Sequence, residues 1–96
     1  MKLVVTALAR SDLNGIAQYT LEKWGRAQLV DYISGLLDTL DQIADKPELG
    51  KSVPKIPARF LRVPYRSHFV FYTLAGGKVR ITRILHQSLD VARHIK

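Results

Sequence analysis

The residues best suited to chemistry lie near the C-terminus, in the run RITRILHQSLD between Arg80 and Asp90. A histidine can exchange a proton near neutral pH, and an arginine can hold a phosphate or a carboxylate through paired hydrogen bonds. Cleavage of RNA at a 2′-hydroxyl requires a base, an acid and cations around the phosphate. The run could be part of such a site, a contact surface for a protein partner, or the polar side of a strand. The residues that could supply a nuclease site are His86, Arg83, Arg62 and Arg66.

Strand geometry weakens the catalytic interpretation. Side chains alternate between the two faces of a strand, so Arg80 and His86 share one face and Arg83 lies on the other unless a bulge intervenes. No Phe, Tyr or Trp follows His86, and Glu48 is the only acid in the loop between residues 46 and 57. We therefore expect His86 to be a scaffold or interface residue, and we expect no catalytic residue in this chain.

Other kinds of reactive site find little support. The chain has no cysteine, which excludes disulfides, zinc–thiolate sites and thiol nucleophiles. His68, His86 and His94 lack the spacing of metal ligands, so we expect neither a metal nor a cofactor. His68 enters a strand-like run, where a histidine usually satisfies a neighbouring polar group. Trp24, a little over one turn after Tyr19, is expected to pack at a helix end rather than to stack on a nucleic-acid base, and it is also a candidate partner contact.

Length and charge limit the possible functions. Ninety-six residues make one domain, 1–96, and the net charge is +7 with a pI near 10.1. From Lys51 onward there are ten Lys and Arg against one Asp, whereas five basic residues stand against seven acidic ones before it. A basic surface of this kind favours an acidic partner: nucleic acid, an anionic membrane or an acidic protein. No stretch approaches the roughly 20 apolar residues of a transmembrane helix, and the apolar run near the start is too short for a signal peptide.

Hydrophobic periodicity predicts one strand and then two helices. The apolar run at residues 3–8 favours a strand. A first helix is expected to begin at Ser11 or Asp12, whose oxygens can cap it, and to end at Trp24 before Gly25. A second helix begins near Arg26, carries one continuous apolar stripe to residue 44, and must end before residue 47, which is proline. Because almost nothing separates the two helices, they must fold back as an antiparallel hairpin.

Three more strands and a short terminal helix complete the chain. The strands are expected at residues 60–64, 68–74 and 79–86, and the helical turn at 89–95. Gly76 and Gly77 form a strong hairpin signal between the last two strands. The order β-α-α-β-β-β predicts an α+β fold in which the helical hairpin packs on a small, mainly antiparallel sheet.

The predicted sheet has apolar residues on both faces, although the hairpin can cover only one. Phe69 and Phe71 point away from Val70 and Tyr72, and strict alternation places Ile84 opposite Ile81. An apolar patch among cations usually marks a binding surface. We expect the terminal helix to cover part of this second face and a partner to cover the rest. The alternative is that the terminal helix covers all of it.

Several motifs, taken together and in this order, resemble the ParE toxins of bacterial toxin–antitoxin modules, within the wider RelE/ParE superfamily. They are YTLEKWG at the end of the first helix, KPELGK after the second, and YRSHFVFYTLAGGKVRITRILHQSLD near the C-terminus. The most specific pieces are Ser67-His68 before the second of the three late strands, and the run from Arg83 to Ser88 followed by Asp90. The resemblance covers nearly the whole chain.

The resemblance implies a cytoplasmic toxin that binds DNA gyrase and is neutralised by a ParD-like antitoxin with an acidic, flexible tail. It also implies a toxin–antitoxin hetero-oligomer that reaches operator DNA only through the antitoxin, with no membrane partner. The alternative is a RelE-like endoribonuclease that cuts mRNA in the ribosome, although such nucleases tend to carry a C-terminal tyrosine that is missing here. A third possibility is a member that has lost toxicity or recognises another target. We assign partner binding to Arg80, Arg83, Phe69, Phe71, Ile84, His86 and Trp24.

Overall fold

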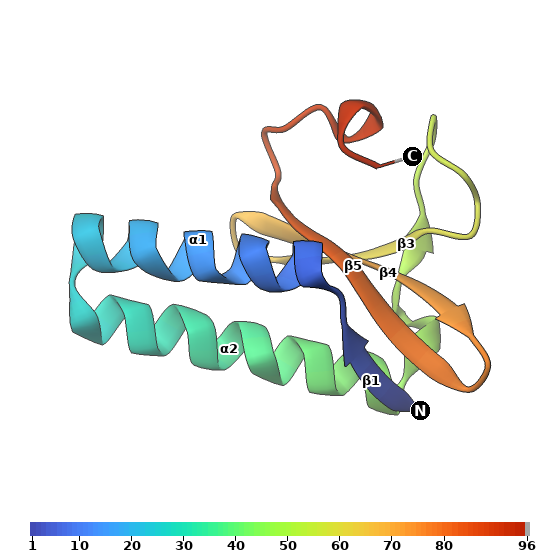
Figure 1. The fold of residues 1–96 in the computed structure, drawn as a ribbon, viewed down its shortest axis with the longest axis horizontal. Helices are drawn as coiled ribbons and strands as arrows, with labels where there is room; N and C mark the ends of the chain where they lie inside the picture. The colour runs from blue at the N-terminus through green and yellow to red at the C-terminus, as the bar shows by residue number, and fades with distance from the viewer. Residues whose placement is uncertain (96) are drawn as a thin grey trace.

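The computed structural model describes residues 1–95 and shows a five-stranded sheet with a helical hairpin on one face (Figure 1). The strand order is β1-β5-β4-β3-β2, with β1 parallel to β5 and all other neighbours antiparallel. This confirms the predicted α+β architecture and adds one short strand, β2, that was not expected. In chain order the elements are β1 (Lys2–Val5), α1 (Ala7–Trp24), α2 (Arg26–Asp45), β2 (Lys51–Ser52), β3 (Leu61–Tyr65), β4 (His68–Ala75) and β5 (Lys78–His86).

Helix α1 begins four residues before the predicted start. Thr6 is its N-cap, and its Oγ1 accepts a hydrogen bond from the N–H of Ala9 at 3.2 Å. The expected strand at residues 3–8 therefore ends early, because a capping threonine followed by Ala-Leu-Ala favours helix over extended chain. Ser11 and Asp12 lie inside the helix, which frees the Asp12 carboxylate for a tertiary contact.

The hairpin is closed by Gly25, whose φ of 89° lies in a region that side-chain-bearing residues rarely adopt. Helix α2 buries one stripe against the sheet, as predicted. Figure 1 shows that the end of the hairpin around Gly25 projects well beyond the sheet. Trp24 is accordingly 65% exposed, so the prediction that it packs at the helix end is wrong. The buried residues of α2 are Tyr32, Leu36, Leu40, Ile43 and Ala44.

One core lies between the hairpin and the sheet. It is anchored by Tyr72, a fully buried tyrosine whose hydroxyl donates to the Pro47 carbonyl and accepts from the Gly50 N–H, at 2.6 and 2.7 Å. A Cβ on Gly50 would collide with the Tyr72 ring, so this position requires glycine. The remaining buried members of this core are Ala9, Leu36, Leu40, Ile43, Val70, Val79, Ile81 and Ile84.

A β-bulge changes which residues of β5 share a face. The ladder pairs Phe71 with Arg83 but Tyr72 with Ile81, which leaves Thr82 as the extra residue. Ile81 and Ile84 therefore both face the helices, and Arg80 joins Arg83 on the outer face, the side of the sheet away from α1 and α2. The prediction from strict alternation, which separated Arg80 from Arg83 and Ile81 from Ile84, is wrong for this reason.

The outer face carries a second, smaller core. Phe71 and Leu85 are buried there beneath the C-terminal segment and the loop before β3. The C-terminal segment contains one 3₁₀ turn, Val91–Arg93, in place of the longer turn expected at residues 89–95. It covers part of the face as predicted, whereas the contribution of the loop was not foreseen. The residues that pack on Phe71 and Leu85 are Val53, Ile56, Phe60, Phe69, Val91 and Ile95.

Candidate functional site

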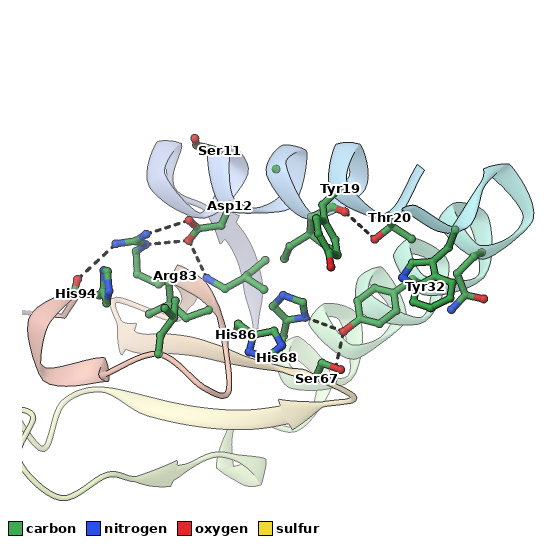
Figure 2. A pocket seen from close by; sticks show the side chains of 17 residues that line it. Ser11, Asp12, Tyr19, Thr20, Tyr32, Ser67, His68, Arg83, His86 and His94 are labelled. Carbon is green, nitrogen blue, oxygen red and sulfur yellow. Dashed lines mark hydrogen bonds and ion pairs between the residues drawn. The ribbon is translucent and has the colours of Figure 1, made fainter. Parts of the chain in front are cut away.

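A groove of about 790 Å³ lies beside the second half of β5 (Figure 2). It exists because β1 has only four residues and pairs with β5 only from Lys78 to Ile81. Beyond Ile81, helix α1 rather than another strand lies next to β5. Side chains from α1, α2, β4 and β5 converge there. The polar and aromatic residues that matter most are Asp12, Tyr19, Tyr32, His68, Arg83 and His86.

Asp12 and Arg83 form a two-point ion pair at one end of the groove (Figure 2). Arg83 Nε lies 2.8 Å from Asp12 Oδ2, and Nη2 lies 2.9 Å from Oδ1. The same carboxylate accepts the backbone N–H of Ile84 at 2.9 Å. Hydrogen bonding to Asp12 raises the pKa of Arg83. The guanidinium is therefore committed within the fold and is not available to clamp a phosphate or a partner's carboxylate.

The floor of the groove is formed by three neighbouring rings, those of Tyr32, His68 and His86. Tyr32 Oη and His68 Nδ1 lie 2.7 Å apart, and the N–H of Ser67 donates to the same oxygen at 3.3 Å. The His68 and His86 rings meet edge to face, with centroids 5.3 Å apart. Burial, and then the neighbouring His86, lower the pKa of His68. His68 thus satisfies a neighbouring polar group, as the sequence predicted.

The structure does not bring the four predicted nuclease residues together. His86 is exposed, and its Nδ1 lies 2.7 Å from Ser88 Oγ. Arg66 pairs with Asp31 at 2.8 Å, and Arg62 lies 3.9 Å from the centre of the Phe69 ring on the outer face. Since Arg83 is held by Asp12, the three arginines serve three separate contacts. Within residues 1–95 this arrangement offers no phosphate clamp around His86.

The predicted partner residues fall into three groups. Phe71 and Ile84 are 0% and 2% exposed, so neither side chain can touch a partner without opening a core. Arg83 is neutralised by Asp12. At the surface lie Arg80, His86 and Trp24, with Phe69 half-buried.

Sequence reasoning missed three residues of the groove: Asp12, Tyr19 and Tyr32. Asp12 was interpreted only as a helix cap, although its partner Arg83 is 71 positions away. Tyr19 is 58% exposed at the groove's edge. The sequence carried no signal for these contacts, because each depends on how α1 and α2 lie against β4 and β5.

The described part of the chain offers neither a metal site nor a membrane-spanning helix. Residues 1–95 contain no cluster of three or more His, Cys, Asp or Glu side chains that could hold a metal ion. No helix in this part of the chain is both long enough and apolar enough to cross a membrane. These findings leave the groove and the charged outer face as the features that require a functional explanation.

Solved structures define the class of fold. A chain of the chromosomal ParDE toxin–antitoxin system of P. aeruginosa superposes with a TM-score of 0.78 at 16% identity, covering 90% of this chain and 95% of the other. A chain of the RelBE2 toxin–antitoxin complex of Mycobacterium tuberculosis gives a TM-score of 0.61 at 19% identity, with 92% of each chain covered. This chain therefore has the same fold as these two chains from toxin–antitoxin systems.

The sequence narrows this class to one family. The model of the ParE toxin of the type II toxin–antitoxin system, parDE, matches residues 3–91. The toxin ParE1 of Caulobacter vibrioides is 37% identical over 87 residues, which cover 91% of this chain and 90% of the relative. The chain belongs to the ParE toxin family, and it is a toxin of the type II toxin–antitoxin class.

Proposed function

We propose that this toxin inhibits DNA gyrase by binding it, without a catalytic step of its own, and that a ParD-like antitoxin neutralises it in the cytoplasm. Membership of the ParE family supports this target over the ribosome. The observation that carries the non-catalytic part is the ion pair of Arg83 with Asp12, at 2.8 and 2.9 Å, in a groove whose lining among residues 1–95 contains no other Lys or Arg. A site that cleaves RNA would need cations free to stabilise charge on the phosphate.

The antitoxin part of the proposal follows from family membership and from charge. A net charge of +7 on 96 residues favours an acidic protein partner and fast association with it. We propose a toxin–antitoxin hetero-oligomer in which operator DNA is contacted through the antitoxin.

The candidate contact surface for gyrase is the projecting end of the helical hairpin. Tyr19 and Trp24 are 58% and 65% exposed there, and Lys23 lies 5.8 and 6.0 Å from the centres of their rings. Exposed aromatic side chains beside a cation are typical of residues that dominate protein–protein contacts. The groove begins at the same two side chains and continues along β5, which extends this surface.

The alternative is a ribosome-dependent nuclease, and the contact between His68 and His86 is the observation that favours it. Two histidines whose ring centres are 5.3 Å apart could act as base and acid. The hydrogen bonds of both rings to Tyr32 and Ser88 instead support a structural role.

One experiment separates the two functions. Purified toxin is added to a gyrase supercoiling assay and, at the same concentrations, to an in vitro translation reaction. We expect inhibited supercoiling with normal translation. Inhibited translation with normal supercoiling would reject the gyrase proposal and favour the nuclease.

A further inference from the structure

The strands of this protein carry positive charge and no negative charge. None of the residues in β1 to β5 is Asp or Glu, so every carboxylate of residues 1–95 lies on a helix, a turn or a loop. Ladder pairing places many of the strand cations on the outer face. Lys51 stands opposite Arg62, Lys2 stands beside Lys78, and Arg80 lies two residues further along β5 than Lys78. We call these five residues the cationic face: Lys2, Lys51, Arg62, Lys78 and Arg80.

No ion pair within residues 1–95 neutralises the cationic face. The ion pairs of residues 1–95 are Arg66–Asp31, Arg83–Asp12 and Arg93–Asp90, and none of them includes a member of this face. Like charges that face each other across neighbouring strands, such as Lys51 and Arg62, disfavour the fold. An arrangement of this kind is expected where a partner supplies the opposite charge.

The surface between these cations is open and mildly apolar. The C-terminal segment covers Phe71 and Leu85, but Val4, Thr73 and Ala75 on the same face are at least partly exposed. Strand spacing places Arg62 and Arg80 two strands and two residues apart, which is about 12 Å. Basic and small side chains thus alternate on this face, over a region that a single extended polypeptide segment could cover.

One cation of this face is held in place. The Cζ atom of Arg62 lies 3.9 Å from the centre of the Phe69 ring, a cation–π contact that restricts the motion of the guanidinium. Such a contact uses none of the N–H donors of the guanidinium in a hydrogen bond, and these donors match the two oxygens of a carboxylate. Arg62 is therefore ordered before any partner arrives, which lowers the entropy cost of binding.

We propose that the cationic face is the docking surface for an acidic polypeptide segment, whose carboxylates pair with Lys2, Arg62, Lys78 and Arg80. The inference rests on the proposed function in so far as the segment belongs to the antitoxin. The proposed contact with the partner does not include Arg83, because Asp12 already neutralises this residue. A protein segment suits this face better than a nucleic acid does, because neither aromatic ring beside Arg62 is open for a base to stack on: Arg62 covers the Phe69 ring, and Phe71 is buried.

The test uses a fluorescent peptide of four Glu-Val repeats, its Lys-Val counterpart and two double variants of the full chain. Lys78→Gln with Arg80→Gln removes two charges from the cationic face. Arg10→Gln with Arg26→Gln removes the same charge from exposed sites on the two helices. We expect the first variant to bind the Glu-Val peptide about five- to tenfold more weakly, with a flatter salt dependence, and the second to change binding less than about twofold.

Three outcomes would overturn the assignment. Equal weakening in both variants would mean that only net charge matters, and equal binding of the Lys-Val peptide would exclude charge recognition. A 20-base-pair DNA duplex that displaces the peptide and loses affinity in the first variant would assign the face to nucleic acid. Supercoiling inhibition, measured in parallel, keeps the proposals distinct: failed peptide binding with normal inhibition rejects only this inference, and normal peptide binding without inhibition rejects only the gyrase target.

Discussion

Asp12 on α1 bonds at once to the side chain of Arg83 and to the backbone N–H of Ile84, so a single carboxylate ties the first helix to the last strand. The Asp12 and Arg83 side chains are 15% and 20% exposed, which makes this a mostly buried pair. Removing one partner from such a pair leaves an uncompensated charge, and this costs more than the loss of a surface ion pair.

We expect Asp12→Ala to lower the free energy of unfolding by about 3 kcal/mol. Arg83→Met should be less costly, because Asp12 would still accept the Ile84 N–H. Urea unfolding of both single variants and of the double variant measures the coupling between them. Strictly additive effects would contradict an ion pair that contributes to stability, and Arg66→Met, at the exposed Asp31 pair, supplies a control expected to cost less than about 1 kcal/mol.

Acid should weaken the fold through His68. Its pKa in the folded chain is lowered, chiefly by burial, so the unfolded chain binds the proton more readily. Stability from this residue is complete above the unfolded pKa of about 6.5 and declines as the pH falls through the range between that value and the folded pKa. Urea unfolding at pH 7.5 and 5.5 should show a smaller acid loss in His68→Gln than in the native chain. The same substitution at the exposed His94 supplies the control. If His68→Gln loses as much unfolding free energy between pH 7.5 and 5.5 as the native chain does, the prediction is contradicted.

Trp24→Ala should weaken the inhibition of gyrase without changing the stability of the fold. Because the side chain is 65% exposed, its removal should change the free energy of unfolding by less than about 0.5 kcal/mol. If the projecting end of the hairpin contacts gyrase, the same variant should lose at least about tenfold in supercoiling inhibition, in the range of an aromatic contact residue. Val30→Ala, also exposed on the hairpin, is a matched control for loss of apolar surface. Full inhibition by Trp24→Ala would place the contact elsewhere.

Gly50→Ala should be destabilising by roughly 2 kcal/mol or more, because the new methyl group would collide with the buried Tyr72 ring and break its hydrogen bonds. Gly15 lies within α1 with open space around it, so Gly15→Ala should instead stabilise the chain by about 1 kcal/mol. The same change, glycine to alanine, should therefore lower the stability of the chain at position 50 and raise it at position 15. Thermal unfolding of the two variants tests this. A loss of stability in both would refute the steric argument at Gly50.

Local signals predicted much of the fold. The start of α2 at Arg26, its end before Pro47 and the turn at Gly76-Gly77 were correct, because each depends on a few neighbouring residues. The start of α1 was wrong, since three candidate caps lie within seven residues and Thr6 takes the role. The β5 faces were wrong because the bulge at Thr82 is set by pairing with β4.

The candidate site was less accessible to sequence reasoning. Its defining contacts join Asp12 to Arg83 and Tyr32 to His68, which are 71 and 36 positions apart. Sequence periodicity shows that a residue faces the core, but it does not show which distant side chain it will meet there. The burial of Phe71 was missed for a related reason: its cover comes from a proline-containing loop with no regular pattern.

Two stretches at the margins of the sheet, one along β5 and one along β2 and β3, are poor sites for another chain to add a strand. Along β5, Asp12 occupies the N–H of Ile84 that a neighbouring strand would otherwise bind. At the other side, β2 has only two residues, and Pro64 in β3 has no N–H to offer. A basic chain of this kind must stay dispersed when no partner is bound to it. Blocking these two stretches lowers the tendency of this chain to form fibrils or exchange strands, without any help from a partner.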